Sequence, residues 1–338
     1  MSGSEAITVE SLGKTFSGGI EAVKEVNLTI HRGEIFGFLG PNGAGKTTTI
    51  SILTTLLLPT TGRAEVDGID VVRSPELVRR KIGLVFQRST ADTLLTGREN
   101  LEVAAGYHGI SPRQAAPRIR QVLEHLDLSE AADRRVKTYS GGMQRRLEIA
   151  AGIVHQPEIL FLDEPTLGLD PQGRSGFWDY IQDLRSTQGM TIFLTTHYLD
   201  EADQLSDRIS IIDHGSILKT GSPAQLKEEL AGDVIAVRPS VPHEQLREVL
   251  RAVPGILSVG EMTPKGACRV KVARAESLVP VIVRSCDAAG IELTDVSTHK
   301  PSLDEVYLSL TGREFRGDPE GIDDSGPGRG NHGPNGGR

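Results

Sequence analysis

The sequence predicts an α/β protein whose main domain holds a mostly parallel sheet, followed by a smaller α+β domain. Between residues 35 and 212, apolar runs typical of buried strands alternate with longer runs of helical periodicity. This alternation produces parallel sheets that helices cover on both faces. Near residue 233 the pattern restarts with shorter elements. We therefore expect a main domain over residues 1–228 and a second domain over residues 229–312.

The first elements of the main domain are a hairpin, a buried strand and a helix. Ala6 to Ile30 contains two alternating runs around the turn at Ser17 to Gly19, which predicts a hairpin. Ile35 to Leu39 is a buried-strand pattern that leads directly into a glycine-rich loop. The chain then reads as a helix from Lys46 to Leu58, with Pro59 just beyond its end.

The rest of the main domain continues the alternation after a mostly helical region. That region runs from about Arg98 to Arg135 and predicts a helical subdomain at about residues 90–155. The elements expected after it are a helix at Gly141–His155, a strand at Ile159–Leu162, a helix at Gln172–Thr187, a strand at Thr191–Thr195, a short helix, and a strand at Arg208–Ile212.

The second domain shows the order strand, helix, strand, strand, helix, strand. This order predicts a small ferredoxin-like domain. Its expected elements are strands at Val234–Val237, Leu257–Met262, Ala267–Val272 and Ile291–Thr298, and helices at Pro242–Val253 and Leu278–Ala289. Residues 313–338 are rich in glycine and proline and almost free of apolar side chains. Such a tail cannot bury enough surface to offset the entropy of ordering, so we expect it to be disordered.

Composition and charge exclude several classes of protein. The formal net charge of −8 argues against a broadly basic surface that binds nucleic acid. No apolar run approaches the roughly 18–20 residues that cross a bilayer, and the N-terminus has no secretion signal. The two cysteines, Cys268 and Cys286, lack metal-ligand spacing and are expected to be reduced packing residues. The chain is therefore expected in the cytosol.

A phosphate-binding loop is predicted at residues 40–48, which fit the pattern GxxxxGK[ST]. Glycines let several backbone N–H groups point to one centre, and the following helix presents its positive end there. Lys46 supplies a charge for the phosphates, and Thr47 supplies a hydroxyl for Mg²⁺. The alternative is a chance glycine-rich turn, which the position between a strand and a helix disfavours. The nucleotide-binding residues expected here are Gly40, Pro41, Asn42, Gly43, Ala44, Gly45, Lys46, Thr47 and Thr48.

Two acids follow the buried strand Ile159–Leu162. Asp163 ends the strand at the sheet edge where such folds bind ligands and is expected to hold Mg²⁺. Glu164 is placed to orient or deprotonate an attacking water. Taken alone, the pair fits equally well a buried strand that ends in two solvated acids.

A second glycine motif, Ser140-Gly141-Gly142, precedes the helix that leads to this strand. Ser140 can cap the helix, and the glycines allow close approach of the backbone to an anion. An ordinary capped helix start is the alternative, and the position shortly before the Asp-Glu strand favours the binding function.

Taken together, these motifs resemble those of ABC ATPases, which are P-loop NTPases. They match the Walker A loop, signature and Walker B motifs of that family, in its order, over roughly residues 6–225. The resemblance adds four residues to the site: Asp170 in the D-loop, His197 as the switch histidine, Gln87 as the Q-loop glutamine and metal ligand, and Phe16 as the ring that stacks on adenine. His197 alone also fits a hydrogen-bonded strand end, and Phe16 alone a core residue. The signature carries Met143 where Gln is common in the family.

The resemblance implies how such a chain works. It implies ATP and Mg²⁺ as ligands, with Lys46, Gln87, Glu164 and His197 acting in hydrolysis. It implies a head-to-tail homodimer in which Ser140 and its glycines complete the site of the other subunit. It also implies a separate membrane permease, contacted by Arg88–Asn100, which holds the chain at the cytoplasmic face of the membrane. A solvated loop is the alternative for that segment.

The C-terminal segment is similar to one group within the family. Residues 301–308 (PSLDEVYL) resemble the ending of daunorubicin-resistance (DrrA-like) export ATPases, which implies export of a hydrophobic drug or lipid-like compound. The same residues also fit a final amphipathic helix that packs on its own domain. Two alternatives stay open, a soluble ABC ATPase without a permease and a P-loop kinase or GTPase. The signature motif disfavours the second.

Overall fold

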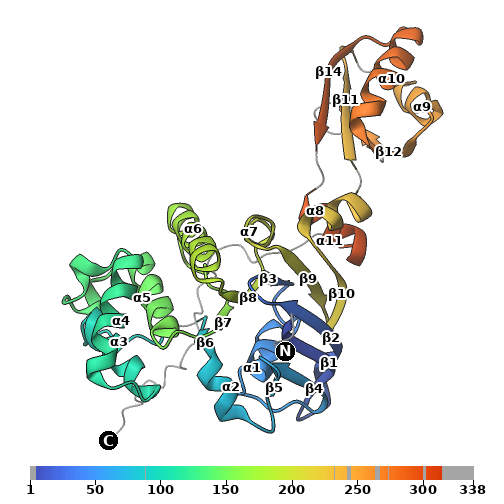
Figure 1. Cartoon of the computed structure of the whole chain (residues 1–338). Helices are drawn as coiled ribbons and strands as arrows, with labels where there is room; N and C mark the ends of the chain where they lie inside the picture. Colours follow the sequence, from blue (N-terminus) through green and yellow to red (C-terminus); the bar gives the residue numbers. More distant parts are fainter. Residues whose placement is uncertain are drawn as a thin grey trace, which may run out of the picture.

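The computed structural model describes residues 5–87, 89–231, 233–241, 245–262, 267–272, 274–299 and 302–313. The tail predicted to be disordered lies outside these residues, apart from Arg313. Figure 1 shows two sheets and a helical lobe in the N-terminal part of the chain, and a separate C-terminal lobe joined to it near α8 and α11.

The first sheet is antiparallel and has the order β2-β1-β4-β5. Its strands are β1 (Glu5–Phe16), β2 (Ile20–His31), β4 (Thr61–Val66) and β5 (Ile69–Asp70). The predicted hairpin is confirmed, since β1 pairs with β2 from Glu5 opposite His31 to Phe16 opposite Ile20. The sequence analysis did not predict β4 and β5, whose short segments carry no sustained alternation of apolar residues.

The second sheet is mostly parallel, as predicted, and has the order β10-β9-β3-β8-β7-β6. Only the pairing of β10 with β9 is antiparallel among its described strands. Every residue of β3, β7 and β8 is buried, which is why these strands read as continuous apolar runs. The strands are β3 (Ile35–Leu39), β6 (Ile82–Val85), β7 (Ile159–Asp163), β8 (Thr191–Thr196), β9 (Arg208–Asp213) and β10 (Ser216–Gly221).

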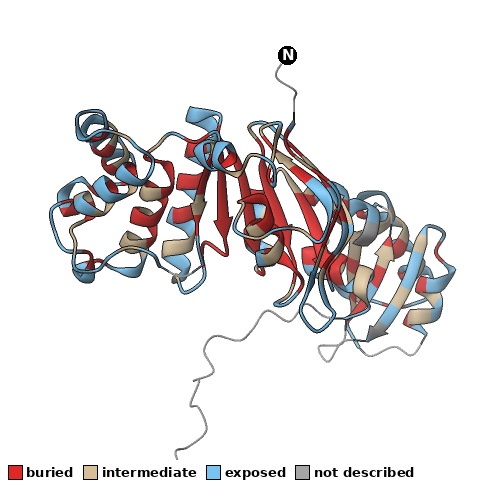
Figure 2. Ribbon diagram, turned by 90° about the horizontal axis from the view of Figure 1, so that it is seen from below, coloured by how far each residue is buried: buried red, intermediate tan, exposed pale blue. Residues whose placement is uncertain are grey.

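Helices flank this sheet on both faces, and Figure 2 shows the buried residues concentrated in the sheets between them. The helix after the glycine-rich loop is shorter than predicted: it ends at Leu53 rather than Leu58, because Thr55 adopts a left-handed backbone with φ of 66°. Among the described helices, none is both long and apolar enough to cross a membrane. The helices are α1 (Lys46–Leu53), α2 (Pro75–Lys81), α6 (Pro171–Gln188) and α7 (Leu199–Leu205), with α3 (Gly97–Tyr107), α4 (Pro112–His125) and α5 (Gly141–Ile153) in the helical lobe.

The C-terminal lobe has the predicted ferredoxin-like topology. Its sheet is antiparallel with the order β12-β13-β11-β14. Both cysteines are buried in its core as free thiols, as expected. Its elements are β11 (Asp233–Pro239), α9 (Leu246–Ala252), β12 (Ile256–Met262), β13 (Cys268–Val272), α10 (Ala275–Ala288) and β14 (Leu293–His299).

The final helix, α11 (Leu303–Thr311), packs on the N-terminal part of the chain. It contacts α7, the short helix α8 (Pro223–Leu226) and the helical turn Lys227–Ala231. Leu303, Val306 and Tyr307 share a core with Leu39 and with residues of β9. The expectation that this helix packs on its own domain is therefore wrong. Its apolar face has the helical period, but the period does not say which core the face covers.

Candidate active site

The glycine-rich loop connects β3 with α1 and is held by close backbone packing. A Cβ on Gly40 would collide with the carbonyl of Ile212, and one on Gly45 with the carbonyl of Ala22. Gly45 also has a φ of 106°, a conformation that side chains with a Cβ rarely adopt. The loop thus requires glycine at these positions, and α1 begins directly after it with Lys46.

The ammonium group of Lys46 is enclosed by the loop. It is 4% exposed, and its Nζ donates to the carbonyls of Gly40 (2.7 Å) and Pro41 (3.1 Å). The same Nζ lies 3.1 Å from Oε1 of Glu164. A buried ammonium needs such partners, because an unpaired charge in this position would be strongly destabilising.

Asp163 and Thr47 face each other at the C-terminal edge of the parallel sheet. The Thr47 hydroxyl lies 3.4 Å from Oδ1 of Asp163, and the Thr195 hydroxyl donates to the same oxygen at 2.6 Å. Burial raises the pKa of Asp163, although both hydroxyl groups favour its charged form. The carboxylate and hydroxyl oxygens are ligands that Mg²⁺ accepts.

Glu164 is the meeting point of three predicted site residues. Its carboxylate accepts a hydrogen bond from Nε2 of Gln87 at 3.1 Å, and Nδ1 of His197 lies 3.2 Å from the same oxygen. Burial raises the pKa of Glu164, but the adjacent His197 and the charge of Lys46 outweigh that effect and lower it overall. Glu164 is therefore held as a carboxylate at a left-handed backbone position with φ of 46°, the kind of strain found at functional sites.

Two residues of this site were not predicted from the sequence. Thr195 bonds Asp163 and also accepts a hydrogen bond from the backbone N–H of Glu164 at 3.0 Å. Arg145 in α5 is 8% exposed and donates to the carbonyls of Pro165 (2.6 Å) and Phe86 (2.7 Å). It therefore ties the helix of the second glycine motif to the segments that carry Glu164 and Gln87. The sequence feature that could have predicted Arg145 is its position within two turns of Ser140, on the helix that Ser140 caps.

The second glycine motif lines a pocket of its own. Ser140 caps α5 by accepting from the N–H of Met143 at 3.3 Å, and Asp170 caps α6 by accepting from Gly173 at 2.8 Å. Both residues line a pocket of about 630 Å³ together with Gly141, Gly142 and Arg145. The residues that line it do not include Lys46, Glu164 or His197. One chain thus presents two separate faces.

The remaining predicted residues are the other loop residues and Phe16. Asn42 and Gly43 at its tip are exposed, Pro41 and Thr48 are half-buried, and Ala44 is buried. Phe16 ends β1, its side chain is 40% exposed, and the Lys14 ammonium lies 5.4 Å from its ring centroid. This exposure speaks against the alternative that Phe16 is a core residue.

The known protein families that match this chain cover its N-terminal and C-terminal parts separately. Residues 23–167 match a family described as ABC transporter, and residues 221–311 match the C-terminal domain of DrrA1-3-like ATP-binding proteins. The daunorubicin resistance ATP-binding protein DrrA3 of Streptomyces coeruleorubidus is 45% identical, over 92% of this chain and 97% of its own length. The chain belongs to the DrrA-like ABC transporter ATPases. It is the ATP-binding subunit of a transporter in a drug-resistance exporter family, and it is an ATPase.

Two other relatives and a solved structure are also similar to this chain over most of their own length. The doxorubicin resistance protein DrrA of Mycobacterium tuberculosis is 40% identical over 90% of this chain and 93% of its own. The linearmycin resistance protein LnrL of Bacillus subtilis is 34% identical over 92% and 99%. Among structures, a dimeric post-hydrolysis state of the cassette MJ0796 with ADP and Pi has a TM-score of 0.59 at 29% identity, covering 64% of this chain and 98% of its own.

Proposed function

We propose that this chain binds ATP and Mg²⁺ at the Lys46 loop and hydrolyses the ATP to drive export of a hydrophobic drug or lipid-like compound. The transported compound would cross through a separate membrane permease, which holds the ATPase at the cytoplasmic face of the membrane. The observation that carries the proposal is the cluster at Glu164, where Lys46, Gln87 and His197 converge beside Asp163.

The loop residues would bind the phosphates. The loop N–H groups and the N-terminus of α1 would present aligned dipoles to the bound phosphates. The ammonium of Lys46 pairs with the carboxylate of Glu164 at 3.1 Å, and a bound γ-phosphate would compete for that ammonium. Binding of ATP would thereby release one partner from Glu164 at the point where the base is needed.

Thr47, Asp163 and Gln87 would hold Mg²⁺, and Thr47 and Asp163 already lie within 3.4 Å of each other through their oxygens. The ion supplies charge neutralisation to the phosphates. Glu164 would orient and deprotonate the attacking water, and His197 and Gln87 would hold that water and the carboxylate in place. Phosphoryl transfer depends mainly on such positioning and charge compensation.

Two copies of the chain would form each complete site. Ser140, Gly141, Gly142 and Asp170 line a pocket apart from Lys46, so in a head-to-tail homodimer they can cover the nucleotide of the partner. Similar cassettes of 29% and 30% identity are described as dimeric. The two pockets of one chain are the complementary halves that such a pairing needs.

The permease and its cargo are inferred from the relatives and one surface. Relatives are named for resistance to daunorubicin, doxorubicin and linearmycin, which favours hydrophobic compounds as cargo. Leu94, Val103 and Tyr107 are large apolar side chains with 68%, 47% and 87% exposure around the start and end of α3. Exposed apolar groups of this kind fit a protein partner. Arg88, the first residue of the predicted contact segment, lies outside the described residues.

The role of Glu164 is tested by Glu164→Gln. We expect ATP affinity within about threefold of wild type and a kcat lower by at least about 100-fold, because the base is lost while the loop is intact. Equilibrium binding of a fluorescent ATP analogue and release of inorganic phosphate measure the two effects. The matched control is Glu124→Gln, an exposed acid on α4, which should hydrolyse ATP normally. Normal turnover by Glu164→Gln would exclude Glu164 as the base.

Export is tested by co-expression with a membrane protein of the permease type encoded by a neighbouring gene, if one is present, and by ATP-dependent efflux of lipophilic compounds. Efflux that Glu164→Gln abolishes supports the proposal. Full ATPase activity without any interaction with a permease would favour a soluble ABC ATPase instead.

A further inference from the structure

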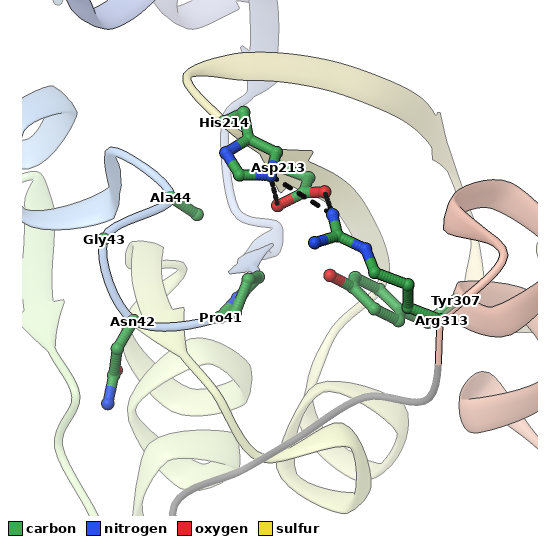
Figure 3. A pocket seen from close by; sticks show the side chains of 8 residues that line it. All are labelled: Pro41, Asn42, Gly43, Ala44, Asp213, His214, Tyr307 and Arg313. Atoms are coloured by element: carbon green, nitrogen blue, oxygen red, sulfur yellow. Dashed lines mark hydrogen bonds and ion pairs between the residues drawn. The ribbon is translucent and has the colours of Figure 1, made fainter.

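A second pocket lies beside the nucleotide loop and joins it to the C-terminal end of the described chain. It has a volume of about 670 Å³, and one wall consists of loop residues 41–44. The other wall is formed by Asp213, His214, Tyr307 and Arg313 (Figure 3). None of these four residues takes part in the hydrolysis mechanism described above.

The end of α11 determines the position of the Arg313 backbone. Leu303, Val306 and Tyr307 anchor the helix in the core beneath β9, and Gly312 ends it in a left-handed conformation with φ of 69°. The backbone N–H of Arg313 then donates to the Thr311 hydroxyl at 3.2 Å. This turn holds the backbone of Arg313 beside the pocket.

The guanidinium of Arg313 is paired with a buried acid. Its Nη2 donates to Oδ2 of Asp213 at 2.8 Å and lies 3.2 Å from Nε2 of His214. The side chain of Asp213 is 9% exposed, whereas that of Arg313 is 60% exposed. A carboxylate so far removed from water depends on its partner more than an exposed one does. Asp213 is the last residue of β9, so the ion pair acts on the turn that follows it.

That turn is hydrogen-bonded to the nucleotide loop. The N–H of Gly215 donates to the carbonyl of Ala44 at 3.0 Å, and the carbonyl of Gly215 accepts from the N–H of Lys24 at 2.8 Å. In a planar trans peptide the carbonyl and the next N–H point in opposite directions. Fixing the Ala44 carbonyl on the turn therefore directs the N–H of Gly45 away from the turn, which is how a loop aims its donors at a phosphate.

We propose that Arg313 is a positioning residue for the nucleotide loop: its pair with Asp213 holds the β9–β10 turn, and the turn orients the Ala44–Gly45 peptide for phosphate binding. Through this pair, a residue just beyond the end of α11 thereby sets the affinity of the ATPase for ATP. This inference rests on the proposed binding of ATP at the Lys46 loop. The residue acts on substrate binding and leaves the chemical step unchanged.

The test is a set of variants of the full chain, measured by equilibrium binding of a fluorescent ATP analogue and by steady-state hydrolysis. Arg313→Ala should raise the Kd and KM for ATP about three- to tenfold and leave kcat within about twofold, since it weakens binding without touching the reacting groups. Asp213→Asn should have the same effect. The double variant should be no worse than either single variant, because both remove one interaction. Arg313→Lys, which keeps the charge, should recover part of the affinity.

The controls separate this inference from the proposed function. Arg284→Ala removes an exposed arginine of α10 whose Nε donates to Pro280 in its own helix, and it should bind ATP as wild type does. Lys46→Ala should lose ATP binding. If Lys46→Ala loses binding while Arg313→Ala keeps the wild-type Kd, the inference fails and the function stands. If Lys46→Ala binds ATP normally, the proposed function fails as well. Additive losses in the double variant would also overturn the inference, since they would show two independent effects.

Discussion

Glu201 is a buried acid that makes the stability of this fold depend on pH. It lies in the first turn of α7, four residues after His197, and is 1% exposed. Burial raises the pKa of its carboxyl group, so the folded chain favours the neutral acid. Above the ordinary pKa of a glutamate, about 4.3, the unfolded chain releases this proton before the folded chain does. The stability of the fold therefore declines as the pH rises through that window.

Replacement of Glu201 by Gln should remove this dependence. The amide is neutral at every pH, so we expect the variant and wild type to have similar Tm values at about pH 4, and the variant to have a Tm about 3 °C or more higher at about pH 8. Thermal unfolding followed by circular dichroism across this range measures the difference. Parallel Tm curves for the two proteins would show that Glu201 is ionised in the fold. Glu124→Gln, on the exposed face of α4, should leave the curve unchanged.

At the same scale, motif spacing predicted most of the site residues that the structure brings together. Lys46 lies beyond the end of β3, and Asp163 and Glu164 lie at the end of β7, so the parallel arrangement of these strands brings the three residues to one edge of the sheet. Arg145 escaped prediction because its partners are backbone carbonyls of Pro165 and Phe86. Carbonyl groups occur at every residue, so no sequence pattern marks these contacts.

Among the elements, the contact between β6 and α5 has no room for a side chain. A Cβ on Gly83 would meet the carbonyl of Gly152 well inside van der Waals distance. By contrast, among the described residues outside its own stretch of helix, a Cβ on Gly106 near the end of α3 meets no atom within 4 Å. The helix that Ser140 caps can therefore approach β6 this closely only with glycine at position 83.

A matched pair of substitutions tests this close approach. Gly83→Ala should lower the free energy of unfolding by about 1–3 kcal/mol, because β6 and α5 must separate. Gly106→Ala should raise it by up to about 1 kcal/mol, because alanine favours the helix. Urea denaturation gives both values. If the two substitutions change the free energy of unfolding equally, the contact between β6 and α5 accommodates a methyl group without loss of stability, and the close approach does not require glycine.

The strands and helices also show which structural features a pattern of apolar residues cannot predict. Buried strands such as β7 were predicted within one residue, since full burial leaves a run of apolar residues. The strands β4 and β10 were missed because they lie at or near sheet edges and mix polar with apolar residues. The docking of α11 was predicted wrongly, since an apolar helix face is equally suited to any core of matching shape.

For the whole molecule, the proposed mechanism requires two chains, because the two glycine motifs line separate sites. Lys46 lies in one face of the chain, and Ser140 lines a different pocket. Neither site alone holds all the groups that the proposed mechanism uses.

This requirement is tested by mixing two inactive proteins, Ser140→Arg and Lys46→Ala. The mixture should recover up to about a quarter of wild-type activity, because half of randomly formed dimers are mixed and each mixed dimer holds one intact site of two. Phosphate release over a range of concentrations measures the recovery, and cross-linking verifies that mixed dimers form. Ser129→Arg, at an exposed position, should remain active alone. Mixed dimers without any activity would argue against shared sites.

The return of α11 also changes what the C-terminal domain is in topological terms. The chain leaves the N-terminal part after Ala231 and comes back to it at Leu303, so the ferredoxin-like sheet is an insertion with two attachments rather than an appendage with one. A module attached at both ends has fewer orientations open to it than one on a single tether. Removing everything beyond residue 228 would therefore also strip Leu303, Val306 and Tyr307 from the core that contains Leu39, the residue directly before the nucleotide loop.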